Sequence, residues 1–274
     1  MSTVHLRIFP ARLSWPLASN DVRALPRDAT RLRLVNKATG FESLREFQSL
    51  EALWCFGIDQ TKLDQISACT SLTELYCEYY LRISDLSCLK KLPHLTALRL
   101  DSCSVIKSLE QLGEFTKLRG LGIENFKNVH DVKPLAKLTD LRQLSVEGSI
   151  WTRMKIDSLA PIANLENLEF LALSSLKVAD ESLAPLTNLR NLKRLVVANY
   201  YPFEEFARLA ASLPNTECQW FEPYVSTTLT CEECKEENRV LLTGKGKSLL
   251  CPRCDARRLQ KHVETFDRVK NAAR

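Results

Sequence analysis

The chain has 274 residues, of which 45% are hydrophobic and 26% are charged, with 38 Lys and Arg against 33 Asp and Glu. This is the composition of a soluble globular protein, and it excludes collagen-like, disordered and membrane-spanning chains, because no apolar run approaches the roughly 18 residues that a span requires. The net charge of +5 is too small to indicate nucleic-acid binding by itself, although residues 1–40 carry +5 and residues 243–274 carry +6 around an acidic centre of −6.

The N-terminal segment, residues 1–28, does not resemble a secretory signal, because Arg7 and Arg12 fall where such a signal is apolar. We therefore expect a cytoplasmic protein with no membrane partner. Val4, Leu6 and Ile8 alternate with polar residues, which indicates a short strand. We expect this segment to cap the repeats that follow, because the first unit of a stacked array needs a cover.

Residues 29–200 contain about eight copies of a short repeat. A weaker copy around Leu32 and Leu34 precedes seven copies of the pattern Leu-x-x-Leu-x-apolar, which begin at Leu50, Leu72, Leu95, Leu118, Leu141, Leu168 and Leu192. Most copies are 22 to 24 residues apart, and one step of 27 residues indicates an insertion around 149–156. We expect this insertion to bulge from a rim of the repeat array.

Each repeat predicts a short turn of helix followed by a strand. Leucines recur every third residue before the strand, as at Leu135, Leu138 and Leu141, which favours 3₁₀-like turns. The closing Leu-x-apolar step alternates as a strand does. Because one unit cannot bury its own leucines, the units must stack into a continuous core with a curved parallel sheet.

These repeats resemble the leucine-rich repeat family, in particular its short class of about 22 residues, to which internalins belong. The resemblance implies an α/β fold, a leucine-rich repeat solenoid with a parallel concave sheet, and a role in binding other proteins. The family usually has an asparagine in the loop after each strand. Here those positions hold other residues, so we expect mainly apolar packing: Ile58, Tyr80, Cys103, Phe126, Ser149, Leu176 and Tyr200.

The alternation of the strands predicts which side chains face outward on the concave sheet. Trp54, Phe56 and Tyr76 form an expected exposed aromatic patch at the N-terminal end. Four acids follow in one column on successive strands, with Arg99 in the neighbouring column: Glu78, Asp101, Glu124 and Glu147. One interpretation is an ordinary solvated surface. The other, which we favour, is a protein-binding surface whose aromatic residues anchor a partner and whose acids attract a basic one.

Residues 201–222 are the expected C-terminal cap. The stretch 202–213 reads as an amphipathic helix that has Pro202 in its first turn and is stopped by Pro214. Cys218, Trp220 and Phe221 then predict a last apolar strand that closes the core. With both caps inside 1–222, we expect this part to fold without the remaining residues.

Residues 223–274 contain two Cys-x-x-Cys pairs, Cys231 with Cys234 and Cys251 with Cys254, separated by a predicted hairpin. Each pair can direct two thiolates to one ion, and two pairs make a closed tetrahedral site that suits one structural Zn²⁺. This segment resembles a zinc ribbon. Disulfides and a rubredoxin-like iron site are the alternatives.

A basic helix is predicted after the ribbon, with Leu259, Val263 and Phe266 at helical spacing. We favour an amphipathic helix that docks on the ribbon. The alternative function is nucleic-acid association through the basic ribbon and this helix, which would show a steep dependence on salt.

The sequence contains no recognised catalytic signature. The run Gly246-Lys247-Ser248 lacks the upstream glycine of a phosphate-binding loop, because position 241 is Leu241. The histidines form no metal-binding pattern, and no nucleophile motif is present. We therefore expect a non-enzymatic, protein-binding scaffold with a structural zinc ribbon.

Overall fold

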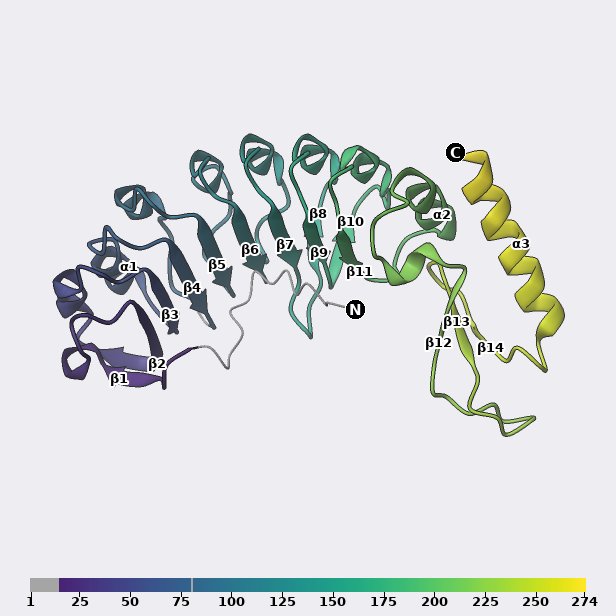
Figure 1. Ribbon diagram of the computed structural model, residues 1–274, viewed down its shortest axis with the longest axis horizontal. Coiled ribbons are helices and arrows are strands. Elements are labelled where there is room, and N and C mark those ends of the chain that lie inside the picture. Colours follow the sequence, from purple (N-terminus) through teal and green to yellow (C-terminus); the bar gives the residue numbers. More distant parts are fainter. Residues whose placement is uncertain (1–14, 80) are drawn as a thin grey trace.

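The computed structural model describes residues 15–79 and 81–274, which form a curved array of stacked repeats followed by a small C-terminal module (Figure 1). The main sheet has nine strands, and neighbouring strands in it are parallel. Its strands follow one another in sequence order: β1 (Ser19–Asp21), β2 (Arg31–Thr39), β3 (Ala52–Phe56), β4 (Glu74–Glu78), β5 (Ala97–Asp101), β6 (Gly120–Glu124), β7 (Gln143–Glu147), β9 (Phe170–Leu173) and β11 (Arg194–Val197). The predicted α/β leucine-rich repeat solenoid is confirmed.

Short helical turns line the convex side, as the three-residue leucine period predicts. They are η2 (Val22–Ala24), η3 (Phe41–Glu46), α1 (Gln60–Ile66), η4 (Ser87–Lys91), η5 (Leu112–Glu114), η6 (Lys133–Lys137), η7 (Ala160–Asn164) and η8 (Ala184–Asn188). One repeat forms an α-helix instead of a 3₁₀ turn, because the carboxylate of Asp59 caps α1 by accepting a hydrogen bond from the Lys62 N–H at 3.0 Å.

The leucines of the repeats form one continuous core between the sheet and the convex turns. Four of the positions that lack the family's asparagine are at most 1% exposed, so the expected apolar packing is found at Ile58, Cys103, Phe126 and Leu176. Ser149 is half-buried and Tyr200 is 37% exposed, so these two positions differ from that expectation. Tyr80 and the proposed cap residues Val4, Leu6 and Ile8 lie outside the described residues.

The insertion forms a second, smaller sheet at the rim where the main strands end. After a turn at 149–152, β8 (Met154–Ile156) pairs in parallel with β10 (Leu176–Val178) of the next repeat. Met154, Ile156, Leu176 and Val178 are buried, which attaches this rim sheet to the core. The expected bulge from the rim is therefore present.

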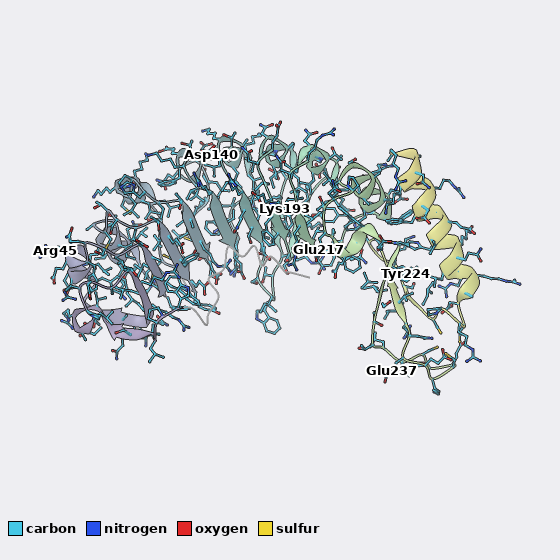
Figure 2. The ribbon with its side chains drawn as sticks, in the orientation of Figure 1. Arg45, Asp140, Lys193, Glu217, Tyr224 and Glu237 are labelled. Carbon is cyan, nitrogen blue, oxygen red and sulfur yellow. The ribbon has the colours of Figure 1, made fainter. Side chains whose placement is uncertain are left out.

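The C-terminal end of the solenoid is closed by α2 (Phe203–Ser212), as predicted, and by a 3₁₀ turn, η9 (Gln219–Phe221). The predicted closing strand is wrong, because the segment forms the turn η9 and pairs with β11 through a single bridge, between Glu217 and Arg194. The Glu217 N–H also donates to the Lys193 carbonyl at 2.8 Å, and both residues are labelled in Figure 2. The side chain of Trp220 performs the closure instead. It is 7% exposed, and its indole N–H donates to the Val197 carbonyl at 2.8 Å.

The remaining residues form a three-stranded antiparallel sheet and a long helix. The sheet contains β12 (Tyr224–Ser226), β13 (Val240–Leu242) and β14 (Leu249–Leu250), and the helix is α3 (Ala256–Ala272). Helix α3 lies against α2 (Figure 1). Its Phe266 is fully buried and belongs to the main core of the solenoid. The ribbon and the repeats thus share apolar packing.

Candidate metal centre and concave face

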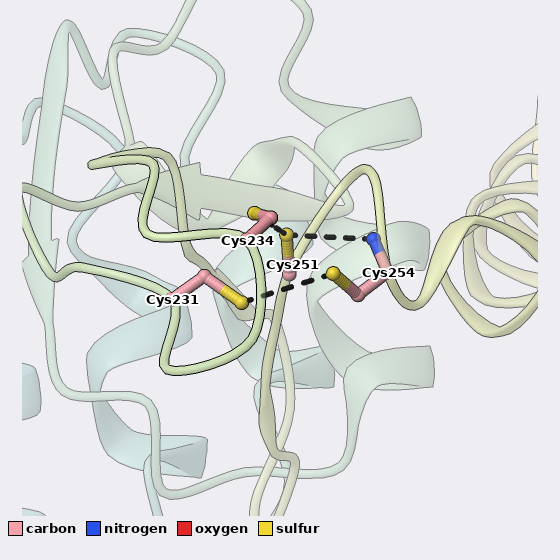
Figure 3. Close-up of side chains that lie close together, drawn as sticks. All are labelled: Cys231, Cys234, Cys251 and Cys254. Carbon is pink, nitrogen blue, oxygen red and sulfur yellow. Dashed lines mark hydrogen bonds between the residues drawn. The ribbon is translucent and has the colours of Figure 1, made fainter.

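The four cysteines predicted as metal ligands come together at one end of the small antiparallel sheet (Figure 3). Cys231 and Cys234 lie on a turn before β13, and Cys251 and Cys254 lie on the turn between β14 and α3. All four Sγ atoms lie within 4.8 Å of one another. The Sγ of Cys231 is 3.9 Å from that of Cys254, and the Sγ of Cys234 is 3.6 Å from that of Cys251.

These distances suit a tetrahedral metal ion. Zinc–sulfur bonds of about 2.3 Å place the sulfurs of a tetrahedral site about 3.8 Å apart, which agrees with both measured pairs. The backbone N–H groups of Cys234 and Glu233 lower the pKa of Cys231 to about 7. Despite the Glu236 N–H, desolvation and contacts with the neighbouring thiols raise the pKa of Cys234, and desolvation also raises the pKa of Cys254. Of these three thiols, Cys231 is therefore the one that ionises most readily without a metal. Four thiolates around one ion leave no position for substrate, so the arrangement is suited to a structural metal.

Three polar residues that were not singled out in the sequence hold the two cysteine turns in place. The Asp255 carboxylate accepts the Cys251 N–H at 3.0 Å. The Arg253 guanidinium pairs with the Glu236 carboxylate at 2.8 Å, which ties one turn to the other. The position of an aspartate directly after the second Cys-x-x-Cys pair was a local signal for this contact, whereas the pairing of Glu236 with Arg253 depends on the folded hairpin.

The aromatic residues expected to form an exposed patch are largely covered. Trp54 is 2% exposed and Tyr76 is 6% exposed, so the expectation of exposure is wrong for both. The indole of Trp15 packs edge-on against them, with ring centroids 5.6 Å from Trp54 and 5.8 Å from Tyr76. The Arg33 guanidinium lies 4.5 Å from the ring centroid of Trp54. Apolar rings next to an open sheet gain more by packing against one another than by meeting water.

Phe56 is the member of the predicted patch that stays half-exposed. It stacks on Tyr79, with ring centroids 5.7 Å apart and an interplanar angle of 16°. Tyr79 itself is 49% exposed. Among the described residues of the predicted patch and its neighbours, Phe56 and Tyr79 provide the accessible aromatic surface, at the ends of β3 and β4.

The four acids lie in one column, as predicted, but they differ in exposure. Glu78 and Asp101 are both 7% exposed, whereas Glu124 and Glu147 are half-buried. Arg99 reaches two of them from the neighbouring column, with its Nε 3.2 Å from Glu78 and its Nη2 2.6 Å from Glu124. From the neighbouring column, Arg99 thus bridges two acids of this column, Glu78 and Glu124.

Hydroxyl groups hold the other two acids. The Ser102 hydroxyl donates to Asp101 at 2.7 Å, and the Ser145 hydroxyl donates to Glu147. Within residues 15–79 and 81–274, neither carboxylate forms an ion pair with a cation. Burial, together with the charge of Asp101 and despite Arg99, raises the pKa of Glu124 to about 7. Within the described residues, serine hydroxyls rather than cations thus hold Asp101 and Glu147.

The basic helix α3 uses part of its charge within the protein. The Lys270 ammonium donates to the Phe221 carbonyl at 3.2 Å, and Arg258 pairs with Asp255 at 2.9 Å. The helix packs mainly on the solenoid, through Phe266 and helix α2. This differs from the docking on the ribbon that we expected from the sequence, because Leu259 is the one helix residue, among those described, that packs against the ribbon's apolar cluster. Among the described residues, no helix has the length and apolar character needed to cross a bilayer.

Comparisons with known proteins give limited similarity. No protein-family model matches the chain. A protein of Trypanosoma equiperdum whose name links it to adenylate cyclase regulation is 30% identical over 147 residues, which cover 53% of this chain and 22% of that protein. The chain thus spans about a fifth of the length of this relative.

Solved structures with similar architecture come from bacteria and plants. An internalin from Listeria monocytogenes is 24% identical, with a TM-score of 0.47 over 65% of this chain and 73% of that one. A leucine-rich repeat protein from Leptospira interrogans is 20% identical, with a TM-score of 0.48 over 69% and 45%. An Arabidopsis receptor kinase in complex with a peptide hormone is 17% identical, with a TM-score of 0.47 over 69% and 33%. The fold assignment rests on the repeat spacing and the strand order themselves, which are those of a leucine-rich repeat solenoid.

Proposed function

We propose that this protein is a non-enzymatic scaffold that binds a partner protein with a basic surface on its concave face. The observation that carries the proposal is the column Glu78, Asp101, Glu124 and Glu147 on adjacent strands. Arg99 pairs with Glu78 and Glu124, whereas the carboxylates of Asp101 and Glu147 accept hydrogen bonds from serine hydroxyls. Like charges in directly neighbouring strand positions destabilise a sheet. A surface that retains them is suited to a partner that brings positive charge.

The half-buried acids are the ones that a partner reaches. Glu124 and Glu147 stand on paired positions of β6 and β7. A lysine or arginine placed between them would favour the ionised form of Glu124, whose pKa is raised to about 7 in the free protein. Phe56 and Tyr79, at the N-terminal end of the concave face, offer apolar contact to the same partner. Trp54 and Tyr76, buried under Trp15, support this surface from below rather than form it.

We also propose that the four-cysteine centre binds one structural Zn²⁺. The donor set of four thiols and the two sulfur separations of 3.6 and 3.9 Å support this assignment. The ion would cross-link the two cysteine turns. This bond would stabilise them, because they have little apolar core of their own. No disulfide joins any of the ten cysteines in the described structure. We propose a cytoplasmic location, as expected from the sequence.

The proposed binding face is tested by affinity capture from a native lysate with three forms of the tagged full-length chain. The parent is compared with Glu124→Lys/Glu147→Lys and with Glu110→Lys/Glu114→Lys, which makes the same charge change away from the concave column, at and beside η5. We expect a partner with a basic surface that the parent and the control retain and that the concave variant loses. Purified partner should then bind the parent directly. Equal capture by all three forms would contradict the proposal.

A further inference from the structure

The turn created by the insertion displays two large apolar side chains to solvent. Ile150 is 88% exposed and Trp151 is 92% exposed. Both lie in the turn between the end of β7 at Glu147 and the start of β8 at Met154. The other tryptophans, Trp15, Trp54 and Trp220, are each at most 8% exposed. Large apolar groups of this exposure are unusual in a protein that buries its remaining tryptophans, and aromatic groups of this kind anchor interfaces.

This turn, which we call the finger (residues 149–152), is held in one conformation. The Ser149 hydroxyl accepts the backbone N–H of Thr152 at 2.9 Å and that of Trp151 at 3.3 Å. The Ser149 N–H donates to the Thr152 carbonyl at 2.9 Å. A Cβ at Gly148 would stand 2.2 Å from the Ser175 carbonyl oxygen, so only glycine fits where the finger begins. A rigid tip loses little conformational entropy when it binds.

The rim sheet and the residue that precedes it carry three cations, Arg153, Lys155 and Lys177, that form no ion pair with a carboxylate of the described residues. Lys155 of β8 and Lys177 of β10 occupy directly paired positions, and both are exposed. Like charges directly opposite each other are destabilising. The guanidinium of Arg153, also exposed, lies 3.8 Å from the ring centroid of Tyr200.

A cavity of about 380 Å³ adjoins this rim sheet, between the solenoid and the ribbon. Arg153, Lys177 and Tyr200 line it, together with Lys245 of the ribbon. Lys245 is already paired with Glu181, so the net positive charge of the cavity wall comes from Arg153 and Lys177. The cavity is large enough for one or two side chains of a partner, and its charge fits a carboxylate.

We infer that the finger and the rim sheet form a docking surface for an acidic segment of a partner protein. Trp151 and Ile150 pack against apolar side chains of that segment, while its carboxylates meet Arg153, Lys155 and Lys177. This surface is separate from the concave acidic column and opposite in charge, so it does not depend on the concave-face proposal. Three cations beside an apolar tip favour a protein over a nucleic acid, since nucleic-acid binding needs more phosphate contacts and usually no apolar finger.

A peptide display library of random sequence provides the probe. We expect selection on the immobilised full-length chain to enrich peptides that combine acidic and apolar residues. A synthetic copy of an enriched peptide should protect Trp151 from acrylamide quenching, because Trp151 supplies the exposed indole of the protein. Trp151→Ser and Lys155→Glu/Lys177→Glu should each weaken peptide binding roughly tenfold or more.

Two controls make the result decisive. Lys117→Glu/Lys133→Glu changes the same charge away from the rim and should bind the peptide as the parent does, and so should Glu124→Lys/Glu147→Lys. Melting temperatures of the finger, rim and Lys117→Glu/Lys133→Glu variants should stay at the parent value, because the side chains substituted in these variants are exposed. Failure to enrich acidic peptides, or full binding by the finger and rim variants, would overturn the inference. Trp151-dependent binding of phosphatidylserine vesicles or single-stranded DNA without peptide binding would overturn it as well.

Discussion

The indole of Trp15 meets the indole of Trp54 edge-on, with ring centroids 5.6 Å apart and planes at 73°. Trp15 precedes the first strand of the sheet, and Trp54 stands in the middle of β3. This contact closes the N-terminal end of the concave face, because it also covers Tyr76 on β4. The residue before the solenoid thereby decides which concave side chains a partner can reach.

Removing this cover should destabilise the N-terminal repeats. We expect Trp15→Ala to lower the free energy of unfolding by about 2–4 kcal/mol, since it exposes the faces of Trp54 and Tyr76 and leaves a void. Urea titration followed by circular dichroism measures the change. Trp151→Ala, which removes an exposed indole, is the matched control and should leave stability within about 0.5 kcal/mol. Equal stability of the two variants would show that Trp15 contributes no packing.

The four-cysteine centre should contain one zinc ion per chain. Elemental analysis of protein purified without added metal should give a stoichiometry near one, because four thiols at tetrahedral spacing bind Zn²⁺ strongly. Cys254→Ser should reduce the zinc content, whereas Cys88→Ser, at a half-buried cysteine far from the centre, should not. Protein that lacks zinc and contains disulfides between these cysteines would contradict the assignment.

The ribbon module should stabilise the repeats through Phe266. Because this side chain is fully buried in the main core, Phe266→Ala should cost about 3–5 kcal/mol. A chain that ends at residue 222 should melt at a lower temperature than the full chain. This expectation differs from that drawn from the sequence, in which residues 1–222 held a complete core. Identical melting of the shortened and full chains, measured by calorimetry, would instead support a complete core within residues 1–222.

The raised pKa of Glu124 should make stability depend on pH. Its folded pKa of about 7 exceeds its usual value of 4.5, so the folded state binds more protons between these values and loses stability as pH rises through them. Glu124→Gln should therefore stabilise the protein by about 1–3 kcal/mol at pH 8 and have little effect below pH 4.5.

Thermal melts of this variant between pH 4 and pH 8 measure the effect. Glu110→Gln removes an exposed carboxylate and provides the control, for which we expect no such pH dependence. If the Glu124→Gln curve runs parallel to that of the parent over the whole range, the carboxyl group is not perturbed in the folded protein.

The repeats and the cluster of four cysteines were predictable from the sequence because their signals are local. Leucine spacing determines which residues of each unit face the core. Because about eight similar units stack on one another, the same assignment applies to each of them. The spacing Cys231 to Cys234 and Cys251 to Cys254 likewise specifies a shared site once a hairpin joins the pairs. Both predictions needed only short-range geometry.

Contacts between segments that are distant in the sequence determine which side chains of the concave face, the rim and the last helix are buried or paired. Alternation correctly placed Trp54 and Tyr76 on the concave side, but only the folded chain brings Trp15 over them and makes them buried. The same is true of Lys155 and Lys177, which become opposite neighbours because the insertion forms an extra strand, and of Phe266, which enters the solenoid core from the last helix. Periodicity shows which face of an element a side chain occupies, whereas the tertiary structure determines what covers that face.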